Sequence, residues 1–67
     1  MDSMELCYNL RRLRKSLKLS AGDVGLFLHV NKQTIYRFEQ GKQLPDAFQI
    51  SELAYLYGCE ISDLYKV

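Results

Sequence analysis

Apolar residues recur at helical spacing along almost the whole chain, and this pattern limits the fold more than any other feature of the sequence. Leu6, Leu10, Leu13 and Leu17 are separated by four, three and four positions, which places them on one face of a helix. Alternation typical of strands is weak, and the chain has only one proline and four glycines. The sequence therefore predicts an all-α fold.

The length of 67 residues allows one small domain, 1–67, and excludes a doubly wound nucleotide-binding fold, a barrel or a two-lobed enzyme. The hydrophobic share of 48% and the charged share of 25% are typical of a globular protein. A core of this size contributes roughly 3–5 kcal/mol, so we expect a compact fold that a partner subunit would stabilise.

Capping signals divide the chain into five predicted helices. Ser20, Asn31 and Asp46 are the predicted N-cap residues, and Gly41 and Gly58 stand where a left-handed residue ends a helix. The helices are predicted over residues 5–17, 21–28, 32–40, 46–57 and 61–66.

Three expectations concern the packing of these helices. The polar face of the first helix, opposite its leucines, carries Asn9, Arg11, Arg12, Arg14 and Lys15. Ala47 is expected on the apolar face of the fourth helix. Gly25 is expected where another helix approaches closely, because a glycine inside a helix otherwise costs roughly 0.5–1 kcal/mol relative to alanine.

The charges are unevenly distributed along the chain, although their sum is only +1. Residues 1–33 carry six Lys/Arg against three Asp/Glu, and residues 34–67 carry three against five. The sequence therefore predicts a basic first half and an acidic second half.

No catalytic site, metal site or cofactor is predicted. Cys7 and Cys59 are too far apart for metal-ligand spacing, and we interpret them as reduced thiols, with a disulfide between them as the open alternative. No Ser/His/Asp, Cys/His or paired-carboxylate pattern has the spacing of a catalytic site. The chain has neither a signal-peptide pattern nor an apolar stretch of about 18 residues, so we expect it in the cytoplasm and not in a membrane.

Residues 20–40 fit a helix-turn-helix unit, in which two short helices are joined by a turn of three or four residues. The second helix of such a unit enters a DNA major groove about 12 Å wide. Its residues that are not needed for packing are hydrogen-bonding and include no acid: Lys32, Gln33, Tyr36, Arg37 and Gln40. Glutamine suits adenine, and arginine or lysine suits guanine.

Three segments follow the pattern of one family: LRRLRKSLKLS, DVGLFLHVNKQTIYRFEQGKQLP and LAYLYGCEISDLY. In order, they contain Leu-Arg-x-x-Arg, a Leu-Ser turn, Glu-x-Gly-Lys-x-x-Pro, Leu-Ala and a final Asp-Leu. The chain thereby resembles the phage-repressor/Cro-like helix-turn-helix family (XRE family) over about residues 6–65. The resemblance implies a compact five-helix, lambda-repressor-like domain that binds an operator in double-stranded DNA as a transcriptional regulator, usually a repressor.

The resemblance also implies roles for single residues. The DNA-binding set is Asn31, Lys32, Gln33, Thr34, Tyr36, Arg37 and Lys42. Within it, Lys32, Gln33 and Arg37 would contact base edges, Tyr36 a thymine methyl or a phosphate, and Lys42 a phosphate. Arg14 and Glu39 would form a structural ion pair between the first helix and the recognition helix.

The sequence departs from the family pattern at several positions. Ala21 stands where a glutamine is common, which weakens an expected phosphate contact. Lys18 and His29 stand at turns where glycine is usual, so both are expected to adopt positive φ. Phe27, Phe48 and Tyr55 stand where polar residues are usual, and exposed aromatic side chains on a small domain indicate a surface for a protein partner.

A homodimer is expected, because one copy contacts too little DNA for high specificity. The predicted dimer interface is the C-terminal helix with Ile61, Leu64, Tyr65 and Val67, together with Phe48. An alternative function remains: a protein-interaction module or antitoxin-like subunit that keeps the helix-turn-helix fold with weak or no DNA binding.

Overall fold

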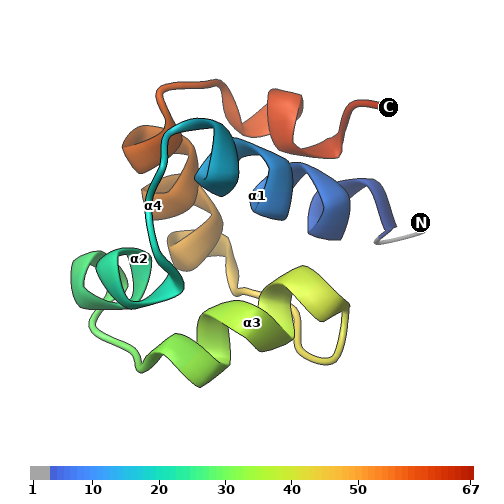
Figure 1. Ribbon diagram of the computed structural model, residues 1–67. Coiled ribbons are helices and arrows are strands. Elements are labelled where there is room, and N and C mark those ends of the chain that lie inside the picture. Colours follow the sequence, from blue (N-terminus) through green and yellow to red (C-terminus); the bar gives the residue numbers. More distant parts are fainter. Residues whose placement is uncertain (1–3) are drawn as a thin grey trace.

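The computed structural model describes residues 4–67 and is shown in Figure 1. In this range it contains no strand, and its elements are α1 (Met4–Ser16), α2 (Ala21–Leu28), α3 (Lys32–Gln40), α4 (Ala47–Tyr57) and the 3-10 helix η1 (Ile61–Tyr65). The all-α prediction is confirmed. None of the helices within the described range combines the length and the apolar character that crossing a bilayer requires.

The predicted helix caps are present. Ser20 and Asp46 each accept a hydrogen bond from the backbone N–H three residues later, and both form reciprocal capping boxes. Asn31 accepts a hydrogen bond from the Thr34 N–H. Gly41 and Gly58 end their helices with φ of 75° and 71°, which lie in the left-handed region.

The last element is not the α-helix predicted over 61–66. It is a five-residue 3-10 helix, in which the Asp63 N–H donates to the Glu60 carbonyl and the Lys66 N–H to the Asp63 carbonyl. These i to i+3 bonds suit a segment that is too short to build successive α-helical turns. Four of the predicted helices are α-helices, and the predicted count of five is not confirmed.

One core joins all five elements, and its largest fully buried side chains are Leu10, Val24, Ile35, Phe38, Leu53 and Leu64. In Figure 1, η1 and α3 lie on opposite sides of α1, with α4 behind. Leu64 is 0% exposed and belongs to this core, so its side chain cannot form part of a dimer interface. Ile61 and Tyr65 are exposed.

Asn9 and Ala47 are among the residues that do not lie on the predicted faces. Asn9 is 3% exposed, because α1 is covered on this side by η1. Its Nδ2 donates to the Leu64 carbonyl over 2.9 Å and to the Lys66 carbonyl over 2.7 Å. Ala47 is exposed, because it lies in the first turn of α4, ahead of the buried stretch that starts at Ile50.

The two cysteines are free thiols, so the alternative of a disulfide is wrong for this structure. Cys7 is buried and Cys59 is half-buried. Burial raises the pKa of the Cys59 thiol, and the nearby carboxyl group of Asp63 acts in the same direction. Cys59 therefore behaves as a small apolar side chain at neutral pH.

Candidate nucleic-acid interface

Backbone contacts fix the path of the turn between α2 and α3. His29 ends α2 with φ of 61°, and the Val30 N–H donates to the Gly25 carbonyl over 2.9 Å. A Cβ atom on Gly25 would lie 2.6 Å from the Val30 carbonyl oxygen and 3.3 Å from the Asn31 carbonyl carbon. The close approach predicted at Gly25 is thus confirmed: the approaching groups are the Val30 carbonyl of the turn and the backbone at the start of α3, where the Lys32 nitrogen would lie 3.4 Å away.

The turn leaves one face of α3 exposed, while Ile35 and Phe38 anchor the opposite face in the core. The exposed residues are Lys32, Gln33, Tyr36, Arg37 and Gln40. The one acid of α3, Glu39, is turned inward with its side chain 3% exposed. The exposed face therefore presents two cations and several hydrogen-bonding groups, with no carboxylate.

Not every predicted DNA-binding residue is free to reach outward. The Asn31 Oδ1 accepts from the Thr34 N–H at 3.1 Å and from the Thr34 hydroxyl at 3.4 Å, so both side chains serve the start of the helix. Thr34 is half-buried. Lys42, in the loop after α3, is exposed, and its backbone N–H donates to the Arg37 carbonyl over 3.0 Å.

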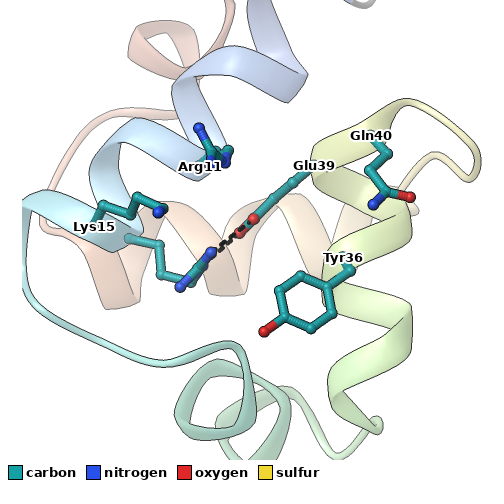
Figure 2. A pocket seen from close by; sticks show the side chains of 6 residues that line it. Arg11, Lys15, Tyr36, Glu39 and Gln40 are labelled. Atoms are coloured by element: carbon teal, nitrogen blue, oxygen red, sulfur yellow. Dashed lines mark hydrogen bonds and ion pairs between the residues drawn. The ribbon is translucent and has the colours of Figure 1, made fainter.

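Arg14 and Glu39 form an ion pair that joins α1 to α3 (Figure 2). The Arg14 Nε donates to Glu39 Oε2 over 2.7 Å, and Nη2 donates to Oε1 over 3.0 Å. The third nitrogen, Nη1, donates to the Leu19 carbonyl over 3.0 Å. The hydrogen bonds to Glu39 raise the pKa of the Arg14 guanidinium, which stays charged in this nearly buried site.

Tyr36 leans toward α1. The Arg14 guanidinium carbon lies 5.9 Å from the centre of the Tyr36 ring, a cation–π contact. Tyr36 and Gln40 of α3, with Arg11 and Lys15 of α1, line an open cleft of about 360 Å³ above this pair (Figure 2).

Sequence reasoning did not identify this cleft. Arg11 and Lys15 are one helical turn apart, which was visible in the sequence, but only the crossing of α1 over α3 brings them beside Tyr36 and Gln40. The basic surface of α3 therefore continues onto α1.

A family model described as a helix-turn-helix domain matches residues 6–64, which is well over half of the chain. No match was found among curated proteins or among solved structures. Together with the geometry of α2 and α3, the match indicates DNA binding.

Proposed function

Because the chain belongs to the helix-turn-helix domain family, we propose that it binds double-stranded DNA in a sequence-specific manner and acts as a transcriptional regulator, most simply a repressor. The observation that carries this proposal is the exposed face of α3, which has cations and amides but no exposed acid. In this proposal α3 inserts into the major groove, as the second helix of such units does.

Lys32, Gln33 and Arg37 contact base edges, because they are exposed and their side-chain groups match guanine and adenine in the major groove. Lys42 binds a backbone phosphate. Asn31 and Thr34 act indirectly, by fixing the first turn of α3.

The interface extends onto α1. Arg11 and Lys15 supply positive charge at the cleft beside Tyr36. When α3 lies in the major groove, this charge would contact a backbone phosphate of the DNA strand that borders the groove. Tyr36 then contacts the backbone side of the groove and not its floor, because its ring lies over Arg14.

A homodimer would place two copies of α3 on half-sites about 34 Å apart. The surface proposed for dimerisation is that of Ile61 and Tyr65, the exposed apolar residues of η1. Light scattering at high protein concentration tests this, and a monomer would exclude it.

The test of DNA binding is selection of bound duplexes from random sequences, followed by titration of variants. Gln33→Ala should cost about 1–3 kcal/mol on the selected site and relax the preference at one base pair. Lys42→Ala should weaken binding evenly on all duplexes, since a phosphate contact carries no sequence information. An even loss for Gln33→Ala would contradict base contact.

No binding to any duplex at low salt would contradict the proposal as a whole. That result would instead favour a helix-turn-helix protein that serves as an interaction module.

A further inference from the structure

An aromatic cluster lies on the surface formed by α2 and α4, outside the proposed DNA interface. Phe27 of α2 stacks on Tyr55 of α4, with ring centroids 6.2 Å apart and an interplanar angle of 13°. Tyr55 is 79% exposed and Phe27 is 38% exposed, so the stack is open to solvent. Phe48, which is 70% exposed, lies two helical turns before Tyr55 on the same face of α4. We name Phe27, Phe48 and Tyr55 the aromatic patch.

The helices that carry the aromatic patch are acidic. α2 and α4 contain Asp23 and Glu52 but no lysine or arginine. Glu52 lies between Phe48 and Tyr55 on their shared face, four residues after the first and three before the second. The patch therefore combines flat apolar area with negative charge.

The negative charge continues past the end of α4. An open hollow of about 380 Å³ is lined there by Tyr55, Glu60 and Asp63. Asp63 is paired with Lys66 over 2.8 Å, whereas Glu60 adds a further carboxylate beside Tyr55.

Charge argues against a second copy of the chain on this surface. A two-fold contact places the same surface of both copies against itself, and α2 and α4 offer no lysine or arginine that could pair with Glu52 or Glu60 of the other copy. The exposed cations of α1 and α3 lie on other elements. A complementary partner needs apolar anchors for the aromatic rings and cations for the carboxylates.

We propose that the aromatic patch binds a basic amphipathic helix of another protein. A helix is favoured over an extended segment, because α2 and α4 use their backbone groups internally and offer no strand edge to pair with. This inference does not rest on the proposed DNA binding, since none of its residues belongs to α3.

The test uses two synthetic amphipathic peptides with leucines at positions i, i+3, i+4 and i+7. Lysine fills the remaining positions of one peptide, and glutamate fills those of the other. Each is titrated into the full chain while backbone amide signals are followed by NMR. The lysine peptide should shift signals of α2 and α4 and leave those of α3 unchanged, whereas the glutamate peptide should shift neither.

Two variants probe the apolar and the charged part of the surface. The double variant Phe27→Ala with Tyr55→Ala should weaken the lysine peptide about tenfold or more, because both rings are anchors. Glu52→Lys should weaken it and should also allow the glutamate peptide to bind. Asp23 is left in place because it forms the capping box of α2.

Matched controls distinguish binding at the aromatic patch from nonspecific binding of the peptide to other exposed aromatic or acidic residues. Tyr8→Ala removes another exposed aromatic ring, and Glu5→Lys makes the same charge change on α1. Both should bind the lysine peptide as the parent chain does, and all variants should keep the parental far-UV circular dichroism.

The proposal is overturned if the lysine peptide does not bind at low salt, if the glutamate peptide binds the parent chain equally well, or if the controls lose as much affinity as the patch variants. Sedimentation showing a dimer that Phe27→Ala with Tyr55→Ala dissociates would assign the patch to a second copy instead. DNA binding is tested in a different assay, the titration of duplexes with the Gln33→Ala variant. Failure of one proposal therefore leaves the other intact.

Discussion

At the scale of single residues, two glycines of the same short helix have opposite surroundings. A Cβ on Gly25 would lie 2.6 Å from the Val30 carbonyl oxygen, which belongs to backbone and cannot swing away. A Cβ on Gly22 would meet only the Ser20 hydroxyl, at an ordinary 3.6 Å. The first glycine is required by the turn, and the second has no steric reason to be glycine.

Substitution by alanine should therefore change stability in opposite directions. Gly25→Ala should lower the free energy of unfolding by about 1–3 kcal/mol, because the turn must shift. Gly22→Ala should raise it by about 0.5–1 kcal/mol, because the unfolded chain loses freedom and the helix gains propensity. Urea unfolding measures both, and two changes of the same sign would contradict this account of the turn.

Tyr57 makes stability sensitive to alkaline pH. Its side chain is buried and its hydroxyl makes no hydrogen bond to another protein atom within the described range. Burial, reinforced by the charge of Glu39, raises the pKa of Tyr57 well above its ordinary value of 10.0. The folded state thus favours the neutral phenol. The resulting contribution of Tyr57 to the free energy of unfolding is fully present below pH 10 and is lost as the pH rises through the raised pKa of the folded state.

Tyr57→Phe should remove that dependence. Thermal unfolding followed from pH 8 to 11.5 should show the parent chain losing stability faster than the variant above about pH 10. At neutral pH the variant should be at least as stable as the parent, because an apolar ring avoids the cost of burying a hydroxyl. Parallel curves for the two chains would rule out Tyr57 as the cause.

At the scale of elements, η1 is held by one amide of α1. The Asn9 Nδ2 donates to three carbonyl groups of the C-terminal segment, those of Asp63, Leu64 and Lys66, and Arg12 Nη2 donates to Asn9 Oδ1. Asn9→Asp keeps the size of the side chain and removes both N–H donors. It should lower the free energy of unfolding by about 1–3 kcal/mol.

Hydrogen exchange distinguishes a local effect of Asn9→Asp from a global one. Amides of residues 61–66 should exchange much faster in the variant, while those of α3 should exchange faster only in proportion to the loss of global stability. Equal acceleration across all helices would show that Asn9 does not hold η1 specifically.

The ion pair between Arg14 and Glu39 connects α1 to the exposed helix α3. Arg14→Ala should lower the free energy of unfolding by about 3–5 kcal/mol, because it leaves the Glu39 carboxylate buried without a partner. Arg11→Ala, at an exposed position one turn earlier, should change it by less than about 0.5 kcal/mol. An unchanged melting temperature for Arg14→Ala would refute a structural role for the pair.

At the scale of the whole molecule, the small net charge of +1 conceals two different surfaces. Cations gather on α1 and α3, whereas α2 and α4, which carry the aromatic patch, contain Asp23 and Glu52 and no lysine or arginine. A salt titration of duplex binding tests the extent of the first surface. Lys15→Ala should reduce the magnitude of the slope of log K against log salt by about the amount that one lost phosphate contact produces.

Lys66→Ala is the control, because this lysine lies at the C-terminal segment and is paired with Asp63. It should leave the salt slope unchanged. A slope that responds equally to both substitutions would mean that duplex binding follows overall charge and not the surface of α1 and α3.

Much of the fold and part of the candidate site could be predicted from the sequence. The bounds of α3, its exposed polar residues and the partner of Arg14 were all predicted, the last from the family pattern. The cleft beside Tyr36 and the burial of Asn9 were not, because each depends on how elements that are far apart in the chain pack against one another.

The sequence by itself determined where helices begin and end, since a cap such as Ser20 with Asp23 joins residues only three positions apart. It also determined which residues share a helix face, because helical spacing sets their direction. The tertiary structure alone decided how many residues of each helix are buried by neighbouring elements. α1 is covered by both α3 and η1, so Asn9 is buried among backbone carbonyls and Arg14 reaches Glu39. Helical periodicity gives direction but not the number of neighbours, and burial depends on both.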